Sequence, residues 1–227
     1  MIEATQTPNM YIRKPQRSVF IILRKIIVGI ASAMLAWGFV SECFVTVSRT
    51  PSDTMAPTIK KSELIFINKL SYGLRLPFFV GKDSGRTFVY RTPRLGDIVL
   101  VSDPSKRDAP LPLRMLVFPI YAVTLGRVDL APKHYLVKRV VGLPNDKISI
   151  RFKRIYVNDR LLEERWTTEH RDSRILPESV SRRDEVPPTV LPANHYYVLG
   201  DNRDYNYDSR EFGFVSFSRI AGQVIGK

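Results

Sequence analysis

Three side chains have the types and settings needed to cut a peptide bond. Ser52 and Thr54 place two hydroxyl groups in a short, turn-prone stretch, and Lys138 lies in an apolar, β-prone run, Tyr135–Val141. Peptide hydrolysis needs a nucleophile, a proton acceptor and donors for the developing oxyanion. Burial in apolar surroundings lowers the pKa of a lysine, which can then accept a proton near neutral pH. We therefore expect a hydroxyl and a lysine to act together, provided that Lys138 folds into a dry site.

Other catalytic chemistries find little support in the sequence. The histidines, His134, His170 and His195, stand in neither a Ser/His/Asp signature nor a metal-binding spacing such as HExxH. Cys43 is the single cysteine, which excludes an intramolecular disulfide and a cysteine-rich zinc site. We expect neither a metal nor a cofactor.

The same residues also have purely structural interpretations. Lys138 would be a surface lysine on an edge strand, because lysines are rarely fully buried. Ser52 and Thr54 would cap a turn or a short helix. Four charged residues would form two surface ion pairs worth at most about 1 kcal/mol each. These pairs are Asp208 with Arg210, and Asp201 with Arg139.

The composition is that of a globular chain with a strong positive charge. Of the 227 residues, 44% are apolar and 25% are charged, which argues against wholesale disorder and against a polytopic membrane protein. The formal net charge of +13 suits either nucleic acid or anionic lipid headgroups. The basic residues are spread along the chain without a helix-turn-helix, zinc-finger or RNA-recognition signature. We therefore expect membrane lipid as a partner, and no nucleic acid.

An apolar segment near the N-terminus predicts a membrane anchor. Ile26–Ser41 is uncharged, and Val19–Leu23 and Cys43–Val47 extend its apolar path toward the roughly 20 residues that span a bilayer. Five basic residues precede it, which favours a cytoplasmic N-terminus with the bulk of the chain outside. A cleaved secretory signal and a buried soluble helix are the alternatives. The expected parts are a basic tail, residues 1–25, an anchor, residues 26–47, and an outer domain, residues 48–227.

Beyond Ser48 the pattern changes to short β-prone runs separated by turn residues, which predicts a mostly β, antiparallel domain after the transmembrane helix. Arg171–Pro192, rich in proline and charge, is expected to be a surface loop. The apolar run Met115–Leu125 is too short to span a bilayer, and it would pack as a strand or dip into the outer leaflet. The expected strands are Leu64–Asn68, Ile98–Ser102, Tyr135–Val141, Lys147–Phe152, Ile155–Val157 and His195–Leu199.

Five segments, in order along the chain, resemble the motif boxes of bacterial signal peptidase I. Any one of them is a weak signal, but five in order after a single anchor are specific. The segments are Pro51–Thr58 (PSDTMAPT), Asn68–Pro77 (NKLSYGLRLP), Arg94–Val99 (RLGDIV), Lys138–Asp146 (KRVVGLPND), and Gly200–Asp204 with Asp208–Arg210 and Gly213.

The resemblance implies an antiparallel β domain of signal-peptidase type and a set of roles for these residues. Thr54 would be the nucleophile and Lys138 the general base. The hydroxyl of Ser52 and the backbone N–H of Thr54 would form the oxyanion hole. Five residues would support the site: Asn206, Asp208, Arg210, Asp201 and Arg139. Small substrate residues would bind in a groove lined by three others: Met55, Pro57 and Leu136.

The chain departs from the family pattern at two positions. The nucleophile box usually has a serine where Thr54 stands, and threonine adds a β-methyl group that stiffens χ1 and crowds the scissile carbonyl. The last box usually has a serine where Asn206 stands, and an asparagine offers Lys138 a carbonyl acceptor instead.

The resemblance also implies a place and a task. A single-pass protein of the bacterial inner membrane, with its catalytic domain on the periplasmic side, would remove signal peptides from secreted or membrane preproteins after small residues. The alternative is a catalytically impaired homologue that keeps the fold and acts as a docking or assembly factor.

Overall fold

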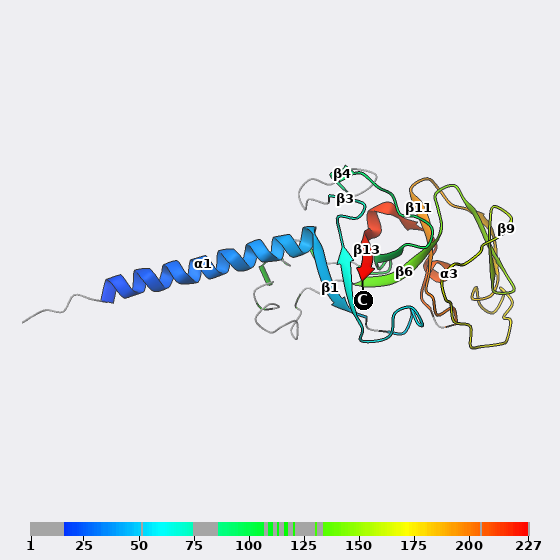
Figure 1. Ribbon diagram of the computed structural model, residues 1–227, viewed down its shortest axis with the longest axis horizontal. Coiled ribbons are helices and arrows are strands. Elements are labelled where there is room, and N and C mark those ends of the chain that lie inside the picture. The colour runs from blue at the N-terminus through cyan, green and yellow to red at the C-terminus, as the bar shows by residue number, and fades with distance from the viewer. Residues whose placement is uncertain are drawn as a thin grey trace, which may run out of the picture.

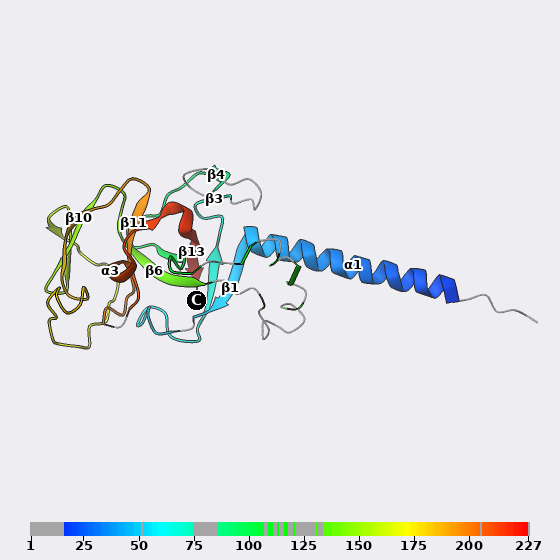
Figure 2. The same ribbon diagram turned by 180° about the vertical axis from the view of Figure 1, so that it is seen from behind.

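The computed structural model describes residues 16–50, 52–74, 86–106, 109–110, 113, 116–117, 120, 130, 134–204 and 206–226. A long N-terminal helix leads into a β domain, and the helix and the smaller of the two main sheets lie at opposite ends of the molecule in both views (Figures 1 and 2). The domain is mostly β and its strand pairs are antiparallel, as expected from the sequence.

The N-terminal helix α1, Gln16–Cys43, contains a candidate membrane span, Val19–Gly38, with a mean hydropathy of 2.2. Length and composition qualify it as a span, and large apolar side chains along it, such as Phe20, Ile27 and Trp37, are exposed. The helix ends earlier than the expected anchor, residues 26–47. Val45–Val47, which were expected to extend the apolar path, belong instead to strand β1, Val45–Arg49, because they pair with Phe66–Asn68.

The larger sheet has seven strands in the order β1-β2-β13-β5-β6-β11-β12. The C-terminal strand β13 is inserted between β2 and β5, so that the two ends of the domain meet in one sheet. The strands that follow β1 are β2 (Leu64–Asn68), β5 (Ile98–Ser102), β6 (Tyr135–Gly142), β11 (His195–Leu199), β12 (Val215–Ser216) and β13 (Ile220–Gly226).

A second sheet has the order β10-β7-β8-β9, and a short hairpin pairs β3 with β4. One turn of helix, α3, follows the loop after β11, and a 3₁₀ turn, η1, precedes β13. The bounds are β3 (Gly73–Leu74), β4 (Phe88–Val89), β7 (Lys147–Arg151), β8 (Arg154–Val157), β9 (Arg160–Leu161), β10 (Val186–Val190), α3 (Ser209–Phe212) and η1 (Phe217–Arg219).

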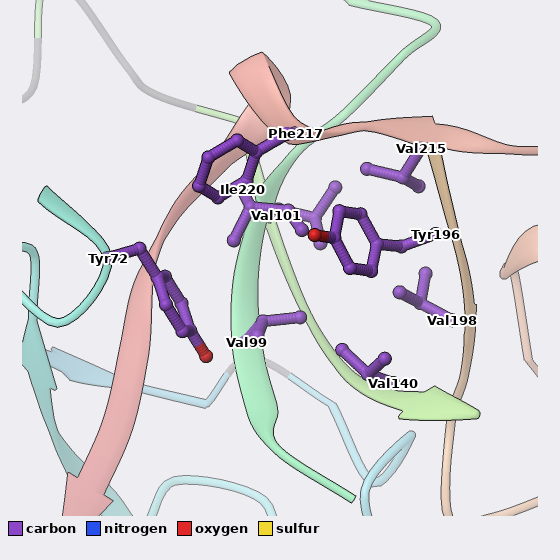
Figure 3. Packing of buried hydrophobic residues seen from close by; sticks show 9 residues of the cluster. All are labelled: Tyr72, Val99, Val101, Val140, Tyr196, Val198, Val215, Phe217 and Ile220. Carbon is purple, nitrogen blue, oxygen red and sulfur yellow. The ribbon is translucent and has the colours of Figure 1, made fainter. Parts of the chain in front are cut away.

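Three buried clusters hold the sheets together. One packs β-branched side chains of β5, β6 and β11 against three aromatic rings, with Phe217 and Tyr196 at 6.0 Å between ring centroids (Figure 3). A second lies between β6, β11 and the smaller sheet, and a third lies beneath the turn that follows β1. Lys138 and Thr54 therefore stand on elements fixed by dense apolar packing.

The six expected strands agree with the structure apart from small differences at their ends. Lys147–Phe152 stops one residue early, because Phe152 and Lys153 adopt positive φ (50° and 66°) in the hairpin turn. Strand β10 lies within the segment Arg171–Pro192, which was expected to be a loop throughout. Six more strands were also not among the expected ones: β1, β3, β4, β9, β12 and β13. The run Met115–Leu125 lies outside the described residues except for Leu116, Val117 and Ile120.

Candidate active site

The turn after β1 presents the two hydroxyl groups. Ile59 and Met55, each 1% exposed, anchor this turn in the third cluster, and the Ile59 N–H donates to the Met55 carbonyl at 2.8 Å. Thr54 is half-buried and Ser52 is exposed, with 3.2 Å between Ser52 Oγ and Thr54 Oγ1. Ser52 and Thr54 thus form a pair of neighbouring hydroxyls at the edge of solvent.

Lys138 is buried in the middle of β6, where its side chain is 1% exposed and its backbone pairs with Val99. Desolvation by burial lowers the pKa of its amine to about 8. Asp208 opposes this shift and Arg210 adds to it. A substantial fraction of the amine is therefore neutral in mildly alkaline solution.

One side chain, Asn206, contacts both halves of this site. Lys138 Nζ donates a hydrogen bond to Asn206 Oδ1, and Asn206 Nδ2 donates to the carbonyl oxygen of Thr54 at 2.8 Å. A second hydrogen bond from Asn206 Nδ2 reaches the carbonyl of Asn202, also at 2.8 Å. Lys138 and Thr54, distant in sequence, are thereby brought to opposite ends of one amide.

The loop that carries Asn206 is held by a buried ion pair. Arg210 donates from Nε and Nη2 to the two carboxylate oxygens of Asp208, both at 2.9 Å. Asp208 also accepts from the Gly200 N–H and caps α3 by accepting from the Arg210 N–H. Arg210 Nη1 donates to the carbonyls of Arg203 and Arg183. Both side chains of the pair are almost fully buried, whereas a surface pair was the structural alternative.

Arg139, next to Lys138 on β6, forms the second buried ion pair. Its Nε and Nη2 donate to the two carboxylate oxygens of Asp201 at 2.8 and 2.6 Å. Its Nη1 donates to the carbonyl of Gly96 at 2.9 Å, and Nη2 reaches Thr58 Oγ1 at 3.3 Å. This arginine ties the loop after β11 to the turn that carries Thr54.

Asn202 is a further residue of the site, to which the sequence motifs assigned no role. Its N–H donates to the carbonyl of Thr54 at 3.2 Å, and its Nδ2 to the carbonyl of Asp53 at 3.4 Å. Its place within the segment Gly200–Asp204 was a signal that could have drawn attention to it.

The three residues expected to line a substrate groove have different surroundings. Met55 is buried, and its side chain packs in the third cluster with Ile59 and Leu100. Pro57 is exposed in the same turn, and Leu136 is half-buried on β6, two residues before Lys138. Met55 therefore contributes to the core beneath the turn, and only Pro57 and Leu136 have substantial exposed surface.

The chain is similar in sequence to several known proteins. The family model described as "Signal peptidase, peptidase S26" matches residues 23–226. The chain is 29% identical over 178 residues to signal peptidase I of Pseudomonas aeruginosa, covering 70% of this chain and 52% of that protein. It is 28% identical over 202 residues to signal peptidase I of Bacillus caldolyticus, covering 82% of this chain and 85% of that protein. The chain thus spans about half the length of the P. aeruginosa relative.

Two further comparisons are more distant. Thylakoidal processing peptidase 1 of Arabidopsis thaliana is 27% identical over 175 residues, covering 77% of this chain and 39% of that protein. Among solved structures, signal peptidase I of Enterococcus faecalis matches 60% of this chain and 98% of that chain, with a TM-score of 0.39 and 21% identity.

Proposed function

The chain belongs to the signal peptidase family, peptidase S26, as the five sequence motifs predicted, and from that premise we propose that it removes signal peptides from exported preproteins. One observation carries the proposal: a buried lysine of lowered pKa is bound to the same amide that holds the Thr54 backbone. A hydroxyl nucleophile needs a nearby base that can take its proton, and a lysine of lowered pKa held on the same amide as the Thr54 backbone supports that role for Lys138.

In the proposed reaction, Thr54 Oγ1 attacks the carbonyl carbon of the scissile bond and Lys138 Nζ takes the hydroxyl proton. The Ser52 hydroxyl and the Thr54 backbone N–H stabilise the oxyanion. Lys138 returns the proton to the leaving amine as the C–N bond breaks, which leaves the signal peptide esterified to Thr54. Water then attacks this ester, with Lys138 again accepting a proton, and the signal peptide leaves with a free carboxylate while Thr54 regains its proton.

The remaining site residues have supporting roles in this proposal. Asn206 orients the amine of Lys138, while the pair of Asp208 and Arg210 fixes the loop behind it. The pair of Asp201 and Arg139 joins that loop to the nucleophile turn. Because both ion pairs are buried and the Asn206 amide is hydrogen-bonded at both ends, these residues hold the reacting atoms without taking part in bond changes.

The substrate would bind in extended form beside β6, where main-chain hydrogen bonds give affinity and shallow pockets admit small residues. Pro57 and Leu136 would contact its side chains directly, and Met55 would shape the pocket from beneath. A leucine in place of alanine just before the cut should cost more than about 1–3 kcal/mol in kcat/KM, because it clashes. Equal cleavage of the two precursors would rule out this groove.

Helix α1 would anchor the protein in the bacterial inner membrane as a single span, with the β domain on the periplasmic side. Five basic residues before Ile26, at and before the N-terminal end of the span, support this orientation, because positive charge favours the cytoplasmic side. The sheet face next to the end of α1 would rest on lipid, since apolar side chains there are between 37% and 60% exposed. These are Phe44, Val45, Val47, Leu64, Phe66 and Ile225.

Thr54 favours a second candidate function. Its β-methyl group crowds the approach of a scissile carbonyl, and a misplacement of about 1 Å costs on the order of a hundredfold in rate. A chain slowed in this way would keep the groove and serve as a docking or assembly factor for preproteins.

Cleavage of a defined precursor separates the two candidates. The full chain in detergent is incubated with a preprotein carrying an Ala-x-Ala site, beside Thr54→Ala and Lys138→Ala, and the products are identified by mass. Cleavage after the site by the parent and by neither variant supports the peptidase. Cleavage by Thr54→Ala at the parent's rate excludes the proposed nucleophile, whereas binding of the precursor without cleavage supports the docking factor.

A further inference from the structure

The amide of Asn206 is hydrogen-bonded at both ends, and only one orientation satisfies its partners. Its Nδ2 lies 2.8 Å from two carbonyl oxygens, those of Thr54 and Asn202, and its Oδ1 faces the amine of Lys138. A carbonyl oxygen cannot donate a hydrogen bond, so a flipped amide would set its own oxygen against two others. The oxygen is thereby directed at Lys138.

The position of this amide is as restricted as its orientation. A Cβ atom added to Gly200 would lie 1.4 Å from Asn206 Nδ2 and 2.5 Å from the Thr54 carbonyl oxygen. The side chain is therefore seated directly against the Gly200 backbone, in space that only a glycine leaves open. The Thr54 carbonyl accepts from Asn206 Nδ2 on one side and from the Asn202 N–H on the other.

The Lys138 amine has a neutral oxygen, Asn206 Oδ1, as a direct hydrogen-bond partner, and charged groups act on it as well. Asp208 and Arg210 are the groups whose charges act on Lys138, and they oppose each other. The carboxylate of Asp208 is already engaged by Arg210 and by the Gly200 N–H. A neutral acceptor holds the amine in place while stabilising its charged form far less than a carboxylate would.

We propose that Asn206 is a positioning residue that couples the base to the nucleophile, because one locked amide sets both the direction of the Lys138 amine and the position of the Thr54 backbone. The inference deepens the proposed function and rests on Thr54 and Lys138 being the reacting pair. A residue that merely fills space would affect folding and rate, and would leave the protonation of Lys138 unchanged.

Two substitutions by side chains of similar size test the acceptor and donor ends of the Asn206 amide. Asn206→Asp puts a carboxylate beside Lys138 and sets an oxygen against the Thr54 and Asn202 carbonyls. Asn206→Leu removes the acceptor and the donor together. The pKa of Lys138 should rise in the first variant and fall in the second, because a carboxylate stabilises the ammonium and a leucine does not.

The measurement is the pH dependence of kcat/KM and kcat for the Ala-x-Ala precursor, with the full chain in detergent. The acidic limb of the pH profile, along which activity rises as Lys138 loses its proton, should move to higher pH by at least about one unit in Asn206→Asp. It should move to lower pH in Asn206→Leu. In both variants kcat should fall at least about tenfold with KM little changed, because Thr54 is displaced. Asn194→Asp, an exposed turn residue, adds the same charge elsewhere and should leave the profile unchanged.

A second readout does not depend on turnover. The pKa of Lys138 is followed by NMR of its Cε–H signals, assigned by their loss in Lys138→Met. Opposite shifts in the two Asn206 variants support the proposal even if the precursor is cut slowly. If the pKa of Lys138 and the acidic limb stay unchanged in both folded Asn206 variants, the proposed role of Asn206 is overturned. The proposed function would still stand in that case, provided that Thr54→Ala and Lys138→Ala are inactive. Full activity of those two variants would instead remove the proposed function.

Discussion

Lys138 and Arg139 are neighbours on one strand and are buried to similar depth, with 1% and 6% of their surfaces exposed. Their partners differ. Arg139 donates two hydrogen bonds to the carboxylate of Asp201 and a third to the Gly96 carbonyl, whereas Lys138 donates to the neutral amide of Asn206. Two cations at the same depth are thus stabilised in different ways.

The difference follows from what each side chain can do with its proton. A guanidinium stays protonated in proteins, so a buried arginine needs a carboxylate to balance its charge. An amine can release its proton when burial disfavours the charge, and the pKa of Lys138 falls to about 8. A cation fully paired with a carboxylate therefore serves the structure, whereas one held by a neutral amide is available for proton transfer.

The largest expected effect comes from removing the amine. Lys138→Met keeps the length of the side chain and loses its base, so cleavage of the Ala-x-Ala precursor should fall on the order of 10³-fold or more. Lys147→Met is the matched control, because Lys147 is an exposed lysine paired with Asp159 at the surface, and its activity should not change. Comparable activity in Lys138→Met and Lys147→Met would mean that Lys138 is not the base. The proposed difference in role between Lys138 and Arg139 would then be wrong.

The same variant should be more stable than the parent at neutral pH. The folded pKa of Lys138 lies below the unfolded value of about 10.4, so between these values the unfolded chain binds more protons and stability rises with pH. Below about pH 8 the parent bears the full cost of a buried charge, at most about 3 kcal/mol. The gain in melting temperature of Lys138→Met should therefore shrink as the pH rises from 8 toward 10.

Arg139→Met should have the opposite consequence for stability. It leaves Asp201 as a buried, uncompensated carboxylate, and loss of one partner of such a pair costs about 3–5 kcal/mol. Urea unfolding in detergent measures this loss, with Arg154→Met, an exposed arginine, as the control. Adding Asp201→Leu to Arg139→Met should recover part of the loss, and an unchanged midpoint in Arg139→Met would mean that the pair is not structural.

Much of the fold could be predicted from local pattern. Strands β2, β5 and β11 have the predicted bounds, because short β-prone apolar runs and flanking turn residues mark their ends. Strand β1 was missed, because its valines continue the apolar composition of α1 and only pairing with β2 identifies them as a strand. Strand β10 was missed because it contains two prolines, which mark a loop or an edge strand.

The site was predicted as a set of residues and not as a set of contacts. Residue chemistry and motif order selected Lys138 and Thr54, the family resemblance selected Asn206, and residue chemistry suggested a carbonyl acceptor for the amine. The second contact of Asn206, to the Thr54 backbone, depends on the space above Gly200 and on the folded positions of two distant segments. Local sequence also cannot separate a groove residue from a core residue, and Met55 lies in the core.

A smaller effect is expected from the ion pair behind the lysine. Asp208→Asn removes a carboxylate that raises the pKa of Lys138 and leaves Arg210, which lowers it. The acidic limb of the pH profile should therefore move to lower pH, by about one unit. Asp159→Asn, an exposed aspartate, is the control. Movement of the limb to higher pH would show that Asp208 acts on Lys138 through the loop rather than through its charge.

The smallest effect concerns the nucleophile and leaves the base unchanged. Thr54→Ser keeps the hydroxyl, which lies 3.2 Å from Ser52 Oγ in the parent, and removes the β-methyl group that crowds the scissile carbonyl. Single-turnover cleavage should therefore become faster by about tenfold. The acidic limb should not move, because Lys138 and Asn206 keep their surroundings. Thr189→Ser, on the exposed strand β10, is the matched control and should have no effect. A faster variant with an unmoved limb would assign the rate limit to the nucleophile, whereas a shifted limb would mean that the hydroxyl and the amine titrate as one unit.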